Sequence, residues 1–414
     1  MFSPQSRVTD SVCLRPVTRD PALLLLPACQ AEVMDFSWRE EDELLRDTVR
    51  RYAAEQVAPD YARWESEPYP RERITELGDL GVLGILIPPE FGGSGGRYVS
   101  LGVAAEEIGR ADFNVTSFLQ LAGISAGLLA LGSDDIQKEW LPGVASGEAI
   151  VAFALTEPGV GSDAAKLVTS ARRDGDDLIV SGEKASCTFA GLADACVVFA
   201  RTGGAGASGI SMVLVPLDRP GVTRQVYDSV GGKLSQRGSL FFDDVRVPAA
   251  NALGAEGAGF TGAMKGFDFN RSIIALACVG TAMQSLDETI AYARERTTFG
   301  KPLAKHEGVA FPIAEHLALL HASRLVAYEA LARADAGLPH TTEAAMAKWL
   351  APKQAADAIH SCLLFHGWSG YGNDLPFAQR HRYIVGFEIG DGTAEIMKAI
   401  IARDTFGREF AAYK

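Results

Sequence analysis

The chain has 414 residues, 47% of them apolar, which is enough to bury a sizeable core in two or three domains. Its formal net charge of -13 argues against a broad nucleic-acid surface, because phosphate binding needs clustered cations, so we expect no nucleic-acid partner. Six cysteines without Cys-x-x-Cys pairs indicate reduced packing residues, and the scattered histidines lack the spacing of metal ligands, so we expect no metal.

Residues 1–33 are expected to be a disordered or untranslated leader, with Met34 as the functional start. The apolar run Ala22 to Leu26 before Pro27-Ala28-Cys29 imitates a lipoprotein signal, and an export signal or a transit peptide are the alternatives. The run is shorter than the roughly 7 to 15 residues of a signal core, and Asp20 counts against it. No apolar run reaches the roughly 18 residues of a membrane-spanning helix, so we expect a cytoplasmic protein without a membrane partner.

Residues 34–150 are predicted to form an α-helical domain. Ser37-Trp38-Arg39-Glu40 is a capping-box pattern that starts a helix ending before Pro59. Helical periods return at 104–110 and 124–131, between proline and glycine clusters. One face of the first helix is predicted to hold six apolar residues: Leu44, Leu45, Val49, Tyr52, Ala53 and Val57.

The pattern changes to short β-type runs between 151 and 254, which predict a middle β-domain, a small barrel or a sandwich. These runs are 177–180, 195–200, 210–215 and 239–247. Helical spacing then returns for 255–414 and predicts a C-terminal bundle of long helices. Its clearest mark is an apolar residue every four positions, at Ile274, Cys278, Ala282, Leu286 and Ile290. The fold class is therefore α+β, with helical domains on both sides of a β-domain.

Near the end of the chain, Asp391 lies between Gly390 and Gly392. Glycines on both sides remove side-chain bulk, so the backbone and the carboxylate can both approach a ligand closely. A carboxylate in such a place can act as a general base. Taken alone, the same segment also fits an ordinary surface turn.

The segment Phe153-Ala154-Leu155-Thr156-Glu157-Pro158-Gly159-Val160-Gly161-Ser162-Asp163 resembles the acyl-CoA dehydrogenase family. Read from the residues, it is a strand end that offers backbone groups and the Thr156 hydroxyl to a flavin ring, followed by a glycine turn near anionic groups. A plain apolar strand with a Pro-Gly turn is the alternative. The resemblance implies flavin contacts from Phe153, Leu155, Thr156, Gly161 and Ser162, and substrate contact from Ser162.

A second segment, Tyr292 to Leu303, resembles the part of the family that reaches across a dimer to the flavin pyrophosphate. Arg296 is its anion ligand, since a guanidinium suits a diphosphate. An exposed arginine that merely ends a helix is the alternative. The resemblance implies further FAD contacts from Ser186, Thr188, Thr298, Phe299, Glu307, Gly367, Trp368, Thr393 and Glu395.

The resemblance also implies a set of substrate contacts. Phe267, Asp268 and Arg271 occupy the start of the helix that meets the coenzyme A arm. Thr116 and Gln120 match the region lining the far end of the acyl pocket, and Gly390 and Gly392 border the base. The implied assembly is a homotetramer that shares FAD across dimers, with a C-terminal four-helix bundle. An electron-transfer flavoprotein is the implied partner.

Three departures from the family pattern bear on the substrate. Most members have glutamate at the position of Asp391 and an aromatic residue at that of Gly390, and Ser186 replaces a tryptophan beside the flavin. Some relatives use a second base position, which here is Asn270, whose amide cannot abstract a proton. An aspartate base with Gly390 and a widened pocket resembles the cyclohexanecarboxyl-CoA dehydrogenase branch of the family. There, Asp391 would remove the α-proton while the β-hydride passes to flavin N5.

Three other functions stay open. The chain could dehydrogenate a branched or carrier-protein-bound acyl thioester by the same chemistry. A nitroalkane oxidase also uses an aspartate base but needs no coenzyme A pocket, so Phe267 and Arg271 count against it. A non-catalytic FAD-containing protein that binds nucleic acid is disfavoured by the acidic composition.

Overall fold

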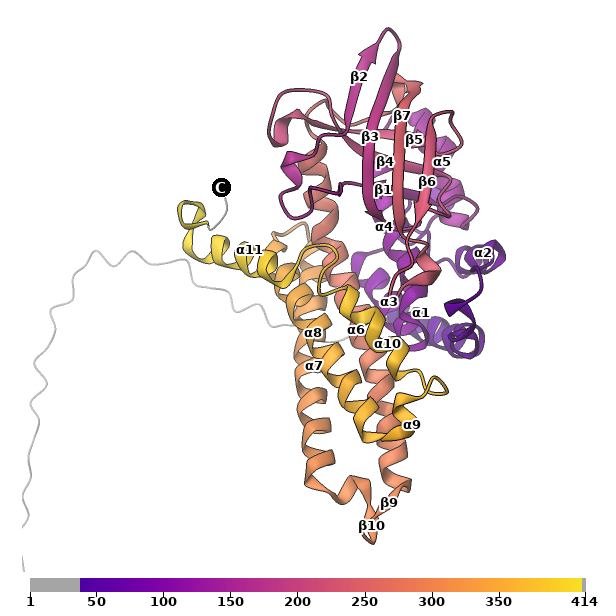
Figure 1. Ribbon diagram of the computed structural model, residues 1–414, viewed down its shortest axis with the longest axis vertical. Coiled ribbons are helices and arrows are strands. Elements are labelled where there is room, and N and C mark those ends of the chain that lie inside the picture. Colours follow the sequence, from indigo (N-terminus) through magenta and orange to yellow (C-terminus); the bar gives the residue numbers. More distant parts are fainter. Residues whose placement is uncertain (1–37, 412–414) are drawn as a thin grey trace, which may run out of the picture. The chain divides into compact units, whose positions relative to one another are not determined.

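The computed structural model describes residues 38–411, so the expected leader and the Ser37 helix cap lie outside the described residues. From Glu40 onward the described chain forms one compact unit. Helices come first, a β-sheet follows, and long helices return at the end (Figure 1), which confirms the predicted α+β fold class.

The N-terminal helices are α1 (Glu40–Tyr52), α2 (Arg71–Asp79), α3 (Tyr98–Ala111), α4 (Thr116–Leu129) and α5 (Asp134–Ser146). After α1 the chain continues as a π-helical turn, Ala53–Val57. Val49, Ala53 and Val57 are buried as predicted, but Leu44 is 69% exposed, so its place on the buried face was wrong. The physical reason is that α1 buries the face that carries Asp42 and Val49, with Asp42 accepting a hydrogen bond from Ser100, and Leu44 lies on the opposite side of the helix.

The middle strands join into one continuous sheet rather than two separate ones. Along it the order is β6-β7-β3-β2-β4-β5-β8, with β1 paired in parallel to β4. β4 and β5 are almost wholly buried and apolar, as their sequence runs predicted. The strands are β1 (Val151–Ala154), β2 (Ser170–Asp174), β3 (Asp177–Cys187), β4 (Ala195–Arg201), β5 (Ile210–Pro216), β6 (Val222–Val226), β7 (Gly238–Pro248) and β8 (Ala252–Leu253).

The C-terminal helices pack around α6 and α8 (Figure 1). The four-residue stripe is fully buried from Ile274 to Leu286, while Ile290 is only half-buried. α3 crosses α6 closely at Gly280, because a Cβ there would lie 2.1 Å from the Glu106 carbonyl oxygen. The elements are α6 (Gly259–Glu295), β9 (Thr297–Thr298), β10 (Lys301–Pro302), α7 (Glu307–Asp335), α8 (Thr341–Phe365), α9 (Trp368–Tyr371), α10 (Phe377–Gly386) and α11 (Ala394–Phe406).

In the described part of the chain, α6 is the one helix long and apolar enough to cross a membrane. Our sequence reading had found no such run. Of the most apolar window of α6, however, 72% is buried inside the protein. A helix that is apolar on every side is expected in the core of a bundle as well as in a membrane, and the packing of α3, α7 and α8 on α6 accounts for its composition.

Candidate active site

Asp391 lies in the short connection between α10 and α11, where the backbone takes left-handed values. Its φ is +56°, an unusual value for a residue with a side chain, and φ at Gly392 is +103°. The φ of Gly392 lies where residues with side chains are strained, and a Cβ there would also lie 2.5 Å from Met397 Cε, which would have to move. At Gly390 a Cβ would meet only the Gly386 carbonyl oxygen, at 3.5 Å, so space for a side chain is open.

The Asp391 carboxylate meets the first half of α6. Asn270 Nδ2 donates a hydrogen bond to Asp391 Oδ2 at 2.6 Å, and Arg271 Nε approaches the Asp391 carbonyl oxygen at 3.4 Å. Arg271 also forms a 2.8 Å ion pair with Asp268, which in turn accepts a hydrogen bond from Thr341. Burial lowers the pKa of the Arg271 guanidinium, although both carboxylates oppose that effect. The structure therefore brings together Asp268, Arg271 and Asp391, all predicted site residues.

Lys348 braces the same loop, and sequence reasoning missed it. Its ammonium group is buried on α8 and donates to the carbonyl oxygens of Phe387, at 2.6 Å, and Gly392, at 3.2 Å. Burial lowers the pKa of Lys348, and the nearby Asp391 charge opposes the shift. The sequence feature that could have indicated a buried lysine is its place on the alanine-rich face of α8, between the buried Ala344 and Ala351.

The predicted flavin-side residues lie where β1 ends beside β3. The Ala185 N–H donates to the Thr156 carbonyl oxygen at 2.9 Å, and the Phe153 ring meets the Phe267 ring edge-on, with centroids 5.8 Å apart. Phe153 and Thr156 are half-buried, so both keep accessible surface. This contact joins the β-domain to α6 three residues before Asn270. Of the other predicted residues here, Leu155 is buried, Thr188 half-buried, and Gly161, Ser162 and Ser186 exposed.

A buried ion pair holds this strand end in place, and it too was missed. Lys184 Nζ lies 2.8 Å from Glu157 Oε1 and 3.1 Å from the Leu155 carbonyl oxygen. Glu157 also accepts hydrogen bonds from the backbone N–H groups of Val168 and Thr169. Burial alone would raise the pKa of Glu157, but these hydrogen bonds lower it overall. A lysine in the alternating pattern of β3 was the signal for this pair.

Thr116 and Gln120 satisfy each other inside α4. Gln120 Nε2 donates to Thr116 Oγ1 at 3.0 Å, and Thr116 Oγ1 donates to the Phe113 carbonyl oxygen at 2.6 Å. Both side chains are buried. The Phe113 ring packs against the Phe387 ring in a tilted arrangement with centroids 4.7 Å apart, which places the start of α4 beside the Asp391 loop. Thr116 and Gln120 therefore lie near the loop, but their side chains are already hydrogen-bonded within α4 and to the turn before it.

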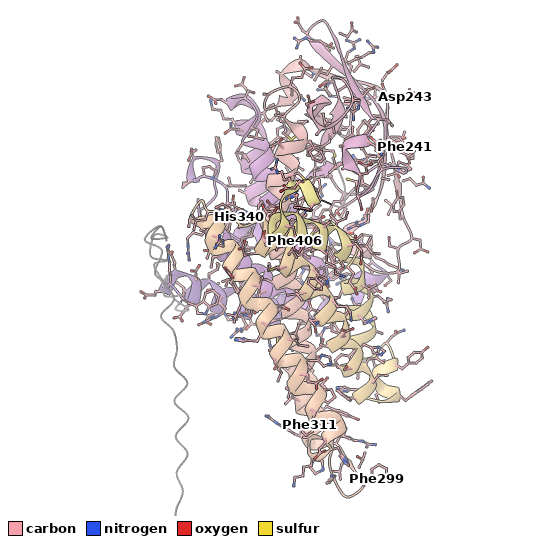
Figure 2. The ribbon with its side chains drawn as sticks, turned by 90° about the vertical axis from the view of Figure 1, so that its left-hand side faces the viewer. Phe241, Asp243, Phe299, Phe311, His340 and Phe406 are labelled. Carbon is pink, nitrogen blue, oxygen red and sulfur yellow. The ribbon has the colours of Figure 1, made fainter. Side chains whose placement is uncertain are left out.

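The predicted pyrophosphate and adenosine residues gather at the other end of α6. Phe299 and Phe311 lie there in Figure 2, and Phe299 is 97% exposed at the tip of the β9–β10 hairpin. Tyr292 stacks on His366 at 4.1 Å, which brings the end of α8 to the same place. The predicted residues in this region are Arg296, Thr298, Phe299, Glu307, Gly367 and Trp368.

Two predicted cofactor residues follow Asp391 directly. Thr393 is the N-cap of α11, where its hydroxyl accepts from the Ile396 N–H at 3.4 Å. Glu395 is exposed and lies 3.8 Å from Lys398, one turn along the helix. No group of three possible metal ligands occurs between residues 38 and 411.

The described site combines a fixed carboxylate, an apolar contact to a sheet edge and accessible backbone groups. Exposed hydroxyl groups can meet the polar edge of a flavin ring. At Gly159 and Gly161, no atom lies within 4 Å of the position that a Cβ would take, so this turn leaves room for the ring. The exposed Arg296 is suited to a diphosphate but lies at the opposite end of the helix. The donor set therefore fits FAD if the two ends come from different copies of the chain.

Three family models match nearly the whole described chain. They are the acyl-CoA dehydrogenase N-terminal domain over residues 39–148, the middle domain over 152–245 and the C-terminal domain over 257–406. A probable acyl-CoA dehydrogenase of Bacillus subtilis is 36% identical over 377 residues, covering 89% of this chain and 99% of that protein.

Two further relatives carry more specific names. The mitochondrial short-chain specific acyl-CoA dehydrogenase of Rattus norvegicus is 36% identical over 369 residues, covering 88% of this chain and 89% of that protein. The structure of a glutaryl-CoA dehydrogenase from Mycobacterium smegmatis, in complex with FADH2, superposes with a TM-score of 0.86. It is 30% identical and covers 91% of this chain and 97% of the other.

Proposed function

Because the chain belongs to the acyl-CoA dehydrogenase family, we propose that it oxidises the α,β bond of cyclohexanecarboxyl-CoA, with Asp391 as the α-proton base. The family consists of FAD-dependent oxidoreductases that act on the CH–CH group of acyl-CoA, so enzyme class and cofactor follow from membership. The observation that supports Asp391 most directly is its place. Its carboxylate adjoins Asn270, three residues along α6 from the Phe267 ring that touches Phe153.

FAD, when bound, would accept the β-hydride. The residues that would hold its ring are Phe153, Thr156 and Ser186, whose backbone and side chains surround the end of β1. Asp391 would take the α-proton on a carboxylate oxygen, leaving the substrate α-carbon free to form the double bond. Phe267 and Phe153 would exclude water beside that carbon, because their rings meet edge-on. Lys348 would keep the loop still by holding two of its carbonyl oxygens.

The preference for a ring rests on the space at Gly390. An added Cβ there meets only one backbone atom, at 3.5 Å, so an aromatic side chain would fill room that is open in this chain. The aspartate side chain is also one methylene shorter than glutamate, about 1.5 Å, which leaves room for a thicker substrate. The rat relative is named for short-chain substrates, so butyryl-CoA is the principal rival.

A second copy of the chain is part of the proposal. Arg296, the residue that follows the last residue of α6, lies 26 residues beyond Asn270 (296 minus 270), about 39 Å at 1.5 Å per residue. One dinucleotide does not extend that far, so Arg296 would serve the site of a partner chain. We propose the homotetramer of the family, an electron-transfer flavoprotein as electron acceptor and a cytoplasmic location.

The test is anaerobic flavin bleaching on mixing the purified protein separately with cyclohexanecarboxyl-CoA, butyryl-CoA, octanoyl-CoA and nitroethane. Rapid bleaching by the cyclic thioester alone is the expected result. Faster bleaching by a straight-chain thioester would keep the reaction and overturn the ring preference. Bleaching by nitroethane alone would transfer the function to a nitroalkane oxidase.

A further inference from the structure

Asn270 is the side chain that holds the Asp391 carboxylate. It is 2% exposed, and its Nδ2 donates to Asp391 Oδ2 at 2.6 Å across 121 residues of sequence. An ionised carboxylate can only accept, so the amide nitrogen must face it. The Asn270 Oδ1 atom is then left without a hydrogen-bond partner among residues 38–411.

This arrangement compensates for a weakness of the base. Asp391 sits in a left-handed conformation between two glycines, where the backbone has few side chains to fix it. Lys348 and Arg271 hold the backbone of the loop through carbonyl oxygens, not through the carboxylate. A base displaced by about 1 Å loses much of its rate, because proton transfer needs the reacting atoms in contact. The loop therefore requires a contact on the carboxylate itself.

We propose that Asn270 is a positioning residue that aims the Asp391 carboxylate at the substrate α-carbon and favours its ionised form. The inference rests on the proposed role of Asp391 and adds to it the group that sets the geometry and working pH of the base. The buried Oδ1 supports the same role. Once Asp391 has accepted the α-proton, its O–H becomes a donor, and a rotated Asn270 amide offers Oδ1 as the acceptor.

An amide N–H donor hydrogen-bonds the ionised form of a carboxylate more strongly than the protonated form, so the test varies the pH. Other charges also face Asp391, and each is kept unchanged in the test. Arg271 of α6 and Lys348 of α8 interact with the Asp391 charge directly. Asp268 of α6 and Arg403 of α11 act on Arg271, and Glu388 of the same loop acts on Lys348. The buried Cys278 of α6 lies near Lys348 as well. Removal of the Asn270 donor therefore isolates one contribution to the pH dependence.

The experiment compares Asn270→Leu and Asn270→Ala holoenzymes with the wild type by anaerobic stopped-flow flavin reduction between pH 5.5 and 9. The probe is whichever thioester bleaches the wild-type flavin fastest. We expect the limiting rate to fall about tenfold to hundredfold, as for loss of a hydrogen bond to a charged group. The acid limb of the rate profile should move to higher pH, because the donor that favours the ionised carboxylate is lost. FAD content and apparent substrate affinity should change less than about threefold.

Ser272→Ala is the matched control, because Ser272 is fully buried on the same helix and its Oγ has no hydrogen-bond partner in the described chain. A residue with only a structural role would lower FAD content and melting temperature without moving the acid limb. That result, or a wild-type rate and profile in both Asn270 variants, would overturn the inference. Asp391→Asn measured beside them separates the two claims. If Asp391→Asn is inactive, failure of the Asn270 variants to respond refutes only the positioning role; if Asp391→Asn stays active, both fail.

Discussion

The two ends of α6 differ in how many of their predicted site residues have partners within the same chain. At its first half, the buried side chains of Asn270 and Arg271 form part-buried hydrogen bonds with Asp391 of the same chain. At its far end, Phe299 is 97% exposed and Trp368 is 85% exposed.

The hairpin at the far end is also strained in a specific way. Phe299 and Gly300 both have positive φ, as a two-residue hairpin turn requires, yet phenylalanine is poorly suited to that conformation. Such a strained and exposed aromatic residue is more consistent with a contact surface than with internal packing. The end of α6 that meets Asp391 finds its partners within one chain, while the exposed far end is the part that we propose serves a second copy.

Asp391→Asn should have the largest effect on the enzyme. The amide cannot accept the α-proton, so turnover should fall about a thousandfold or more. FAD should stay bound, because the carboxylate lies at the substrate end of α6. Absorbance at the flavin band and steady-state turnover measure both properties. Glu388→Gln, on the same loop, is the control and should keep its activity. Undiminished turnover in Asp391→Asn would remove this residue from the mechanism.

Arg296→Ala should chiefly weaken FAD retention, by about tenfold or more in the dissociation constant, because a charged hydrogen-bonding partner of the pyrophosphate is lost. The FAD-to-protein ratio after gel filtration measures it. Arg294→Ala, an exposed arginine two residues earlier, is the control.

Mixed assemblies of Arg296→Ala and Asp391→Asn chains test the two-chain site more sharply. If Arg296 serves the partner's site, a mixed dimer contains one site with both wild-type residues. Random pairing then restores about a quarter of the wild-type turnover, because half the dimers are mixed and half their sites are intact. No recovery would mean that Arg296 acts within its own chain.

Gly390→Tyr should shift specificity rather than abolish activity. Tyrosine would occupy the open space beside Asp391, so turnover of cyclohexanecarboxyl-CoA should fall about tenfold more than that of butyryl-CoA. The ratio of kcat/KM values for the two thioesters is the measurement. Gly390→Ala adds only the Cβ, which fits at 3.5 Å, and should leave the ratio unchanged. Equal losses on both substrates in the tyrosine variant would contradict the steric argument.

Much of the fold was predictable because it follows local spacing. The four-residue stripe from Ile274 to Leu286 predicted the buried face of α6, and the apolar run at 195–200 predicted β4. Leu44 shows the limit of such reasoning. It matches an apolar period in sequence, but Asp42 has hydrogen-bond partners on α3 that secure its burial instead.

The site was predictable only as separate segments. Asp391 stood out because of its glycines, yet its contact with Asn270 joins positions 121 residues apart, which no local pattern encodes. Lys348 and the Lys184–Glu157 pair escaped notice for a related reason. A buried lysine looks like any surface lysine until its acceptors, here backbone carbonyl oxygens and a buried carboxylate, are located in space.

The smallest expected effect on turnover concerns Asp112, near the end of α6 that meets Asp391. A change there should affect the stability of the protein more than its turnover. Its carboxylate is buried and caps the turn that begins at Phe113, where Oδ1 accepts a hydrogen bond from the Asn114 N–H. The other oxygen, Oδ2, has no hydrogen-bond partner in the described residues. Burial raises the pKa of Asp112 to about 6, against an ordinary value of 3.8. As pH rises, this carboxyl group therefore ionises at a lower pH in the unfolded chain than in the folded protein. The wild type loses stability as pH rises from about 4 to above 6, by at most about 3 kcal/mol.

Asp112→Asn keeps an acceptor for the Asn114 N–H but cannot ionise, so its advantage should be larger at the higher pH. We expect the urea midpoint of the variant to exceed that of the wild type by much more at pH 7.5 than near pH 4.5, where the wild type has lost only part of this stability. Asp135→Asn, on the exposed first turn of α5, is the control and should show no such divergence. If Asp112→Asn is less stable at both pH values, the carboxylate is held ionised by the nearby Arg380 charge, and the buried end of the site is more polar than its apolar contacts suggest.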